Sequence, residues 1–225
     1  MATELRTTAR LWQLLSPTLP VGAYSYSQGL ETAVEQGWVG DEDGAREWIL
    51  GQLEWSLPRL DLPLLARLRR AWEDAEEAAV RALSRRLLAS RGSAELQAED
   101  RQLGQALARL LADLGHSAAA DWARDADATF ATLFALAGTV WGIGRRELLA
   151  GYAWTWCENQ TAAAVKLVPL GQTAGQRLLL AAGERLEGAV ERALALAEED
   201  IGLTAPGLAL AASLHETQYS RLFRS

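Results

Sequence analysis

Residues 103–114 have the sequence Leu-Gly-Gln-Ala-Leu-Ala-Arg-Leu-Leu-Ala-Asp-Leu, and the spacing of their leucines decides the fold class. The leucines recur every three or four residues, which places them along one face of an α-helix. Three further stretches have similar spacing: Leu64, Leu65, Leu68 and Trp72; Val80, Leu83, Leu87 and Leu88; and Leu179, Leu186, Val190 and Leu194. No segment shows the sustained apolar–polar alternation, bounded by hairpin turns, that strands require. The sequence therefore predicts an all-α protein.

The prolines support this prediction, because all six lie outside the apolar stripes, at positions 17, 20, 58, 63, 169 and 206. A proline inside a helix removes a hydrogen bond and clashes with the preceding turn. The segment 16–20 therefore separates a short first helix from the next. We expect Asp61 to cap a helix that begins near Pro63, and Thr204 to cap one that begins near Pro206. Roughly nine or ten helices are expected.

Composition changes along the chain. Residues 73–127 are charged and alanine-rich, which predicts amphipathic helices facing solvent. Residues 128–171 carry fewer charges and several small residues that let helix backbones approach closely, so we expect their helices to form the centre of the bundle. No flexible linker or repeat divides the chain, which predicts one domain over residues 1–225. Wide apolar faces rich in Ala and Gly also suit a homodimer.

Charge and rare residues exclude several classes of function. The 22 basic and 29 acidic residues give a formal charge of −7, which argues against a nucleic-acid-binding protein. The single cysteine, Cys157, excludes an internal disulfide framework and a thiolate zinc site. The two histidines, His116 and His215, are too far apart in sequence to form a local metal motif.

Targeting segments are not expected either. Glu4 and the lack of an apolar run after it do not fit a signal peptide. The uncharged run 128–144 is short for a membrane span and is diluted by Thr and Gly, so a buried helix is the better interpretation. We expect a protein of the reducing cytoplasm that does not enter a membrane.

Three segments differ from ordinary helix sequence, and the first is residues 16–30. Its hydroxyl groups cluster beside turn residues at Pro20 and Gly22, which suits either a polar recognition surface or a tight connection that caps the following helix. A nucleophilic serine at Ser25 or Ser27 is a third hypothesis. It is disfavoured because either serine would need a distant histidine as its base.

The second segment, residues 162–175, contains the only lysine, Lys166, just before a Pro-Leu-Gly break. Lys166 either pairs with the carbonyl groups at the end of its own helix or presents a flexible cation to a partner. Spacing alone does not distinguish these two roles. The segment lacks the terminal Lys-Ser/Thr of a phosphate-binding loop.

The third segment is residues 215–225, His-Glu-Thr-Gln-Tyr-Ser-Arg-Leu-Phe-Arg-Ser. Tyr219, Leu222 and Phe223 would share one face of a helical turn. The segment is either a docked or disordered terminus or a partner-binding anchor, and its aromatic and arginine residues favour the anchor. His215 and Glu216 are too few groups for a metal site in one chain, and Cys157 is best explained as a packed residue.

Together these segments resemble the UreF family of urease accessory proteins. The matching stretches, in family order, are residues 14–31 (Leu-Leu-Ser-Pro-Thr-Leu-Pro-Val-Gly-Ala-Tyr-Ser-Tyr-Ser-Gln-Gly-Leu-Glu), 61–68 (Asp-Leu-Pro-Leu-Leu-Ala-Arg-Leu), 165–172 (Val-Lys-Leu-Val-Pro-Leu-Gly-Gln) and the tail 215–225. The first and last are specific motifs, whereas the charged middle of the chain carries little family signature.

The resemblance implies an all-α homodimer in the cytoplasm that has no enzymatic activity and no cofactor. It also implies an adaptor that brings the GTPase UreG to the complex of UreD (also called UreH) with apo-urease, and so assists nickel insertion. By the same resemblance Lys166 meets the GTPase, the tail orders against UreD, and residues 20–29 shape the partner-facing surface. The residues implied in partner binding are Pro20, Gly22, Tyr24, Ser25, Ser27, Gln28, Gly29, Lys166, Pro169, Gly171, Gln172, His215, Glu216, Thr217, Gln218, Tyr219, Ser220, Arg221, Leu222, Phe223 and Arg224.

One alternative from a different class stays open. A symmetric dimer doubles each ligand, so His215 and Glu216, or Cys157, could meet their copies across the dimer axis and carry nickel. That role would make the protein a metallochaperone rather than an adaptor.

Overall fold

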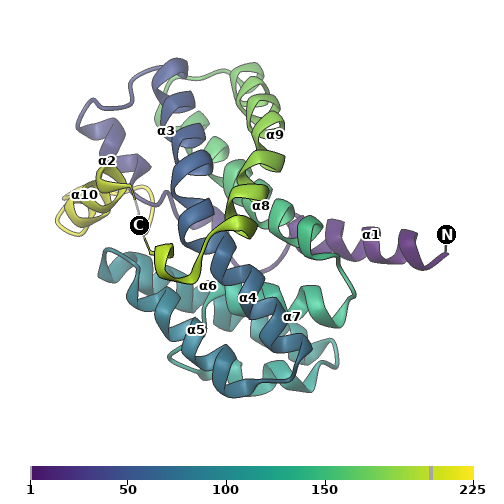
Figure 1. Ribbon diagram of the computed structural model, residues 1–225. Coiled ribbons are helices and arrows are strands. Elements are labelled where there is room, and N and C mark those ends of the chain that lie inside the picture. The colour runs from purple at the N-terminus through teal and green to yellow at the C-terminus, as the bar shows by residue number, and fades with distance from the viewer. Residues whose placement is uncertain (1, 203–204) are drawn as a thin grey trace.

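The segments with helical apolar spacing all form α-helices in the computed structural model, which describes residues 2–202 and 205–225. No strand occurs in these described ranges, so the all-α prediction is confirmed (Figure 1). The described part of the chain contains ten α-helices: α1 (Ala2–Leu15), α2 (Leu30–Glu35), α3 (Glu42–Trp55), α4 (Asp61–Glu73), α5 (Glu77–Ala89), α6 (Ala94–Asp113), α7 (Phe130–Val140), α8 (Arg145–Leu167), α9 (Gln172–Ala195) and α10 (Pro206–His215). Short 3-10 turns η1 (Ala23–Ser25), η2 (Leu57–Arg59), η3 (Ser117–Arg124) and η4 (Glu198–Asp200) connect some of them.

Helices α7 and α8 form the centre of the bundle, as their small residues predict. Helix α7 is buried from Phe130 to Gly138, and α8 contacts α1, α2, α3, α4, α7 and α9. Two glycines make these contacts close. A Cβ atom on Gly138 would lie 2.5 Å from Leu148, and one on Gly151 would lie 2.8 Å from Leu15. The uncharged run 128–144 is therefore a core helix and its flanking turns.

The leucine stripe of α6 faces this core. Leu103, Leu107 and Leu111 are buried, and the helix packs against η3 and α7. A Cβ atom on Gly104 would lie 2.6 Å from the backbone carbon of Thr129, so only glycine allows α6 this approach to the start of α7. α6 is thus fixed against the core along most of its length.

Helix starts agree with the sequence in part. Asp41, Ser93 and Thr129 cap α3, α6 and α7 through side-chain hydrogen bonds to backbone N–H groups. The expected cap by Asp61 is wrong. Asp61 is the first residue of α4, its carboxylate binds the guanidinium of Arg91, and Pro63 lies in the first helical turn, where no intrahelical N–H bond is lost. The expected cap by Thr204 lies outside the described residues.

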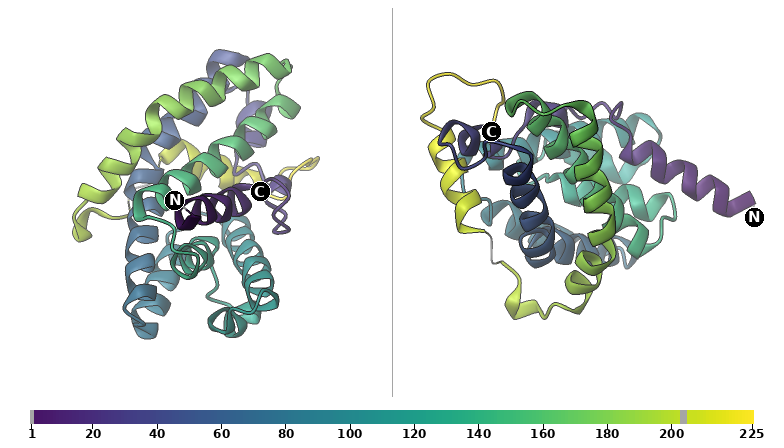
Figure 2. Two further views of the ribbon diagram at one scale, coloured as in Figure 1. Left: turned by 90° about the vertical axis from the view of Figure 1, so that its right-hand side faces the viewer. Right: turned by 90° about the horizontal axis from the view of Figure 1, so that it is seen from above.

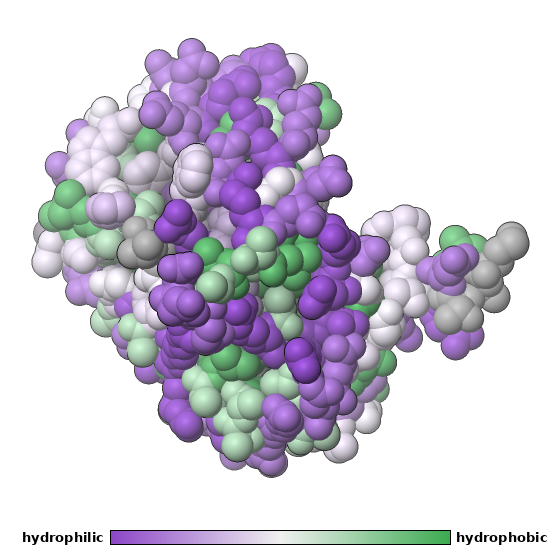
Figure 3. Space-filling model, in the orientation of Figure 1, coloured by the Kyte–Doolittle hydropathy of each residue, from purple (hydrophilic) through white to green (hydrophobic). Residues whose placement is uncertain are grey.

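The two ends of the chain lie far apart. Helix α1 projects from the body, whereas the last residues lie beside α2 and α10 (Figure 2). The face that carries α3 and α9 is largely hydrophilic, and a band of hydrophobic surface crosses it below their lower ends (Figure 3). None of the helices in the described ranges combines the length and the apolar character that a membrane span needs.

Candidate functional site

The loop before α2 has a backbone that only particular residues favour. Gly22 and Gly29 both have φ +82°, in the left-handed region where glycine carries no steric penalty. At Gly29 a Cβ atom would also lie 3.1 Å from the Cβ of Ala211 and from the backbone nitrogen of Ala212. Gly29 therefore lets α10 pack directly on the start of α2.

Helix α8 holds this loop from the other side. The Asn159 amide donates to the carbonyl of Ala23 at 2.7 Å, and the Gln160 amide donates to the carbonyl of Ser27 at 3.0 Å. Both donors lie on the central helix of the bundle, so the loop is attached to the rigid part of the fold.

The tail, residues 216–225, follows α10 without forming another helix. The expected helical turn that would place Tyr219, Leu222 and Phe223 on one face is therefore wrong. Phe223 turns inward and is buried, whereas Tyr219 and Leu222 are exposed. The backbone N–H groups of Leu222 and Phe223 bind the carboxylate of Glu31, and that of Arg224 binds the carbonyl of Ser25.

Two glutamates of the body bind the tail. The carboxylate of Glu31 accepts hydrogen bonds from the backbone N–H groups of Leu222 at 2.6 Å and Phe223 at 2.8 Å. Glu95, at the start of α6, forms an ion pair with Arg221. His215 is fully buried between these acids, with Nδ1 2.5 Å from Glu95 and Nε2 3.4 Å from Glu31. Charge-assisted hydrogen bonds of this kind are about twice as strong as neutral ones.

The last two residues join the loop before α2 directly. The backbone N–H and the hydroxyl of Ser27 both donate to the carbonyl of Ser225, at 3.0 and 2.6 Å. The N–H of Arg224 donates to the carbonyl of Ser25 at 2.9 Å. We call this contact of residues 25–31 with residues 215–225 the loop–tail junction. It brings together the first and third segments that the sequence analysis singled out.

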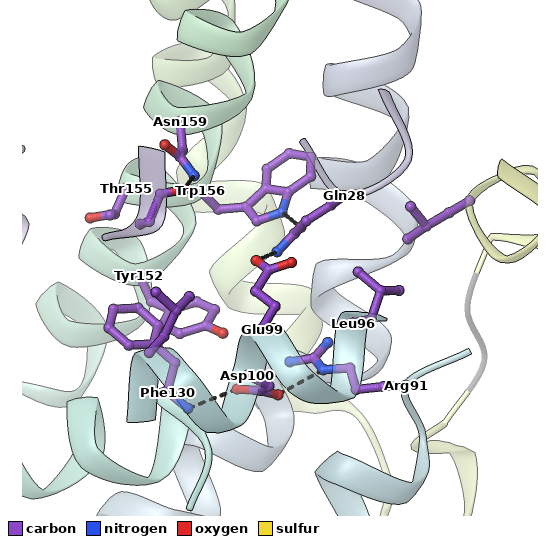
Figure 4. Close-up of a pocket in the computed structure, with 13 residues that line it drawn as sticks. Gln28, Arg91, Leu96, Glu99, Asp100, Phe130, Tyr152, Thr155, Trp156 and Asn159 are labelled. Carbon is purple, nitrogen blue, oxygen red and sulfur yellow. Dashed lines mark hydrogen bonds and ion pairs between the residues drawn. The ribbon is translucent and has the colours of Figure 1, made fainter. Parts of the chain in front are cut away.

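A small, partly open pocket of about 80 Å³ lies under the junction (Figure 4). The side-chain amide of Gln28 connects two residues that line the pocket. It accepts a hydrogen bond from the indole N–H of Trp156 and donates one to Glu99, each at 2.6 Å. Glu99 also accepts from the Ser225 hydroxyl at 2.6 Å. Glu99 therefore connects the pocket with both sides of the junction.

Deeper in the same pocket, Arg91 binds two buried acids. Its guanidinium lies 2.7 Å from a carboxylate oxygen of Asp61 and 2.8 Å from one of Asp100. Asp100 also accepts from the N–H of Phe130 at 2.7 Å, at the start of α7 (Figure 4). The network links α4, α6, α7 and the connection between α5 and α6 below the junction.

Burial raises the pKa of Glu99 to about 7, against the hydrogen bonds from Ser225 and Gln28, which lower it. The folded state therefore binds a proton more tightly than the unfolded state does. The stability from this group is fully present below the unfolded pKa near 4.5, and it is lost as the pH rises through about 7. The loop–tail junction is thus expected to be less stable at alkaline pH than at mildly acidic pH.

We expect Glu99→Gln to remove this pH dependence. Between roughly pH 7.5 and pH 5 the parent protein gains about 2 kcal/mol of stability from Glu99, and the amide variant gains none of it. Urea unfolding at both pH values measures the difference. Glu47→Gln, on an exposed position of α3, is the matched control. An equal difference between parent and Glu99→Gln at both pH values would contradict the assignment.

Lys166 is exposed in the last turn of α8, and its Nζ lies 5.5 Å from the ring centroid of Phe223. This cation–π contact connects the second segment with the tail. The break that follows separates α8 from α9, and Pro169, Gly171 and Gln172 are exposed there. These three residues do not take part in the loop–tail junction. Pro20 and Gly22 do not take part in it either, because they lie earlier in the same loop.

The junction and the parts of the chain next to it present several large side chains to solvent. Tyr24, Leu210, Leu214, Tyr219 and Leu222 are exposed, although they lie beside well-ordered elements. Leu210 and Leu214 are one turn apart on α10, on a face next to that of the buried Ala211 and His215. Exposed aromatic and aliphatic groups on an ordered scaffold are typical of interaction surfaces.

The groups proposed for catalysis or metal binding have other partners. The Ser27 hydroxyl donates to the carbonyl of Ser225, and burial raises the pKa of Cys157 to about 12. The carboxylate of Glu216 accepts from the N–H of Ala94 at 2.7 Å. Within the described ranges, no cluster of three or more His, Cys, Asp or Glu side chains is arranged to hold a metal ion. A nickel-carrying role for His215 and Glu216 would require both to leave these partners.

The acids of α6 at the junction and in the pocket beneath it were not predicted from the sequence. Glu95, Glu99 and Asp100 lie in the stretch expected to face solvent, yet Glu99 and Asp100 are buried. A signal for them exists, because Leu96, Glu99 and Asp100 precede Leu103 at the spacing of the leucine stripe. Acids on the apolar face of a helix indicate buried partners, since an unpaired buried charge is strongly unfavourable.

Comparison with known proteins gives consistent matches. The UreF family model matches residues 39–183. The chain is 56% identical over 216 residues to the urease accessory protein UreF of Alkalilimnicola ehrlichii, covering 96% of this chain and 95% of that one. It is 52% identical over 222 residues to that of an Azoarcus species, covering 96% and 94%, and 49% identical over 215 residues to that of Teredinibacter turnerae, covering 96% and 97%. The chain therefore belongs to the UreF family.

Proposed function

We propose that this protein is a urease accessory protein that acts as a non-enzymatic adaptor. It recruits the GTPase UreG to the complex of UreD (UreH) with apo-urease, and so assists nickel insertion during urease maturation in the cytoplasm. The observation that carries the proposal is the loop–tail junction, which joins two segments distant in sequence into one surface. Its relatives carry the name urease accessory protein UreF.

The ordered tail supports a UreD-binding role for residues 215–225. The body holds the tail backbone through Glu31 and Ser27, while Tyr219 and Leu222 face solvent. A preformed anchor loses less conformational entropy on binding than a disordered one. Tyr24 and the exposed leucines of α10 lie on neighbouring parts of the same scaffold and would extend the contact area.

Lys166 supports a separate contact with UreG. Its ammonium is exposed, and none of the described residues forms an ion pair with it. A flexible cation of this kind suits an acidic group or a phosphate of a partner. The exposed break at Pro169, Gly171 and Gln172 lies close in sequence and belongs to the same proposed contact.

The adaptor also acts as a homodimer in this proposal. Gly183 and Gly188 are exposed on the outer side of α9, and small residues of this kind favour close helix packing across a symmetry axis. The proposed dimer contact does not include the tail. Deletion of the tail is therefore expected to leave the dimer intact.

Deleting residues 216–225 tests the proposal. We expect the truncated protein to remain folded and dimeric but to lose binding to UreD, because Tyr219, Leu222 and Phe223 are removed. Co-purification with tagged UreD measures binding, and light scattering measures the oligomeric state. In the matched point variant Lys166→Ala, UreD binding is retained and the GTPase response of UreG changes. Unchanged co-purification of UreD with the truncated protein would contradict the anchor role.

A further inference from the structure

A groove of about 590 Å³ lies between the loop 17–26 and α6, and Arg224 of the tail also lines it. Pro17, Pro20 and Tyr24 contribute apolar surface on the loop side. Gln102, Gln105 and Arg109 contribute polar groups on the α6 side. The groove is separate from the small pocket that contains Glu99, and it is much larger.

The charges of this groove are all positive. Arg109 and Arg224 line it, and no acidic residue is among the described residues that do so. Neither arginine has a carboxylate partner in the described part of the chain, whereas Arg91, Arg177 and Arg221 all form ion pairs. Arg109 is exposed and donates only to the carbonyl of Ala123 at 3.3 Å. In a protein with a formal charge of −7, this is a local basic site.

The side chains of the groove are held in place. The Tyr26 hydroxyl donates to Gln102 at 2.6 Å, and the Gln105 amide donates to the carbonyl of Asp125 at 3.0 Å. The Arg224 guanidinium lies near the same Tyr26 hydroxyl. The backbone N–H of Arg224 donates to the carbonyl of Ser25, which fixes the position of the Arg224 backbone. Its side chain extends from there and lines the groove. Such preorganised polar groups favour binding because little entropy is lost.

We infer that this groove binds an acidic, extended peptide segment of a partner protein. Carboxylates of the segment would pair with Arg109 and Arg224, and apolar side chains between them would contact Pro20 and Tyr24. Arginine suits this role because its planar guanidinium binds a carboxylate through two parallel hydrogen bonds. The inference rests on the proposed adaptor function only for the identity of the protein that carries the segment.

Binding of a synthetic peptide tests the groove without any partner protein. The probe is a fluorescein-labelled nine-residue peptide of alternating Asp and Leu, measured by fluorescence anisotropy with the full chain. A Lys-Leu peptide of the same length is the charge control. We expect the parent protein to bind the acidic peptide only, and the double variant Arg109→Glu, Arg224→Glu to bind it at least about tenfold more weakly.

Arg145→Glu is the matched protein control, because Arg145 is exposed on α8 and does not line the groove. We expect its affinity for the acidic peptide to equal that of the parent. Circular dichroism checks the fold of each variant, and Arg109→Gln provides a second variant that adds no negative charge. Hydrogen exchange with bound peptide is expected to show protection at residues 17–26 and 102–109.

Three results would overturn the inference: no binding of the acidic peptide, equal binding by the double variant, or equally tight binding of a single-stranded oligonucleotide. Capture of UreD by the parent and variants separates the two proposals. Loss of capture in Arg109→Gln, which leaves the tail unchanged, supports the assignment of the segment to this partner, and equal capture overturns it. If the parent binds the peptide but captures no UreD, the groove stands and the adaptor function fails.

Discussion

Replacing Glu31 with alanine is expected to release the tail. The substitution removes the acceptor for the N–H groups of Leu222 and Phe223 and one of the acids beside His215. Each hydrogen bond to a charged group contributes about 1.5–3 kcal/mol, so losing two shifts the ratio of docked to undocked tail by a factor of roughly 100 or more. Hydrogen exchange of residues 216–225 measures this shift as faster exchange of their amides.

Glu35→Ala is the control for this experiment, because Glu35 ends the same helix and is exposed. It removes the same charge, so an effect of net charge alone would appear in both variants. We expect tail exchange in Glu35→Ala to match the parent. Slow tail exchange in a folded Glu31→Ala protein would show that the carboxylate does not hold the tail.

Replacing Arg91 with alanine is expected to have the largest effect on stability. The substitution leaves Asp61 and Asp100 buried without their cation, with side chains 7% and 5% exposed. Breaking a buried pair in this way costs about 3–5 kcal/mol, because the remaining charges are uncompensated. Urea unfolding of the purified variant measures the loss as a lower transition midpoint at an unchanged slope.

Two further variants identify the cause of this loss. Adding Asp61→Asn and Asp100→Asn to Arg91→Ala removes the uncompensated charges, so we expect partial recovery of stability. Arg85→Ala removes a guanidinium from the preceding helix α5, but that group is 58% exposed and 3.6 Å from Asp127, so its loss is expected to stay below about 1 kcal/mol. Equal losses in Arg85→Ala and Arg91→Ala would contradict the buried-pair explanation.

Much of the fold follows from sequence because its causes are local. The spacing of Leu103, Leu107 and Leu111 predicts one buried face, and all three are buried. The small residues after position 128 predict close helix packing, which Gly138 and Gly151 confirm. Proline positions place the helix boundaries near the observed ones. Each of these signals depends on residues within a few turns of one another.

The site could be predicted only in part, because its contacts are between residues far apart in sequence. The motifs around Ser27 and Phe223 identify two unusual segments, but no local rule states that Ser27 binds Ser225. The role of Asp61 shows the same limit. From its neighbours in sequence alone, a helix cap is the best explanation of Asp61. The observed partner of its carboxylate is the guanidinium of Arg91, 30 residues later in the chain. The tail fails as a predicted helix because Glu31 binds its backbone N–H groups.

The hydrogen bonds between Ser27 and Ser225 span 198 positions of the chain. During synthesis on the ribosome, Ser27 leaves the exit tunnel long before its acceptor has been made. Helices α4, α5, α6 and α7 contact one another and can pack while translation continues, since domains begin to fold before synthesis ends. The surface that includes the tail is completed only after Ser225 has emerged. A nascent chain thus lacks the complete loop–tail junction until translation of this region is over.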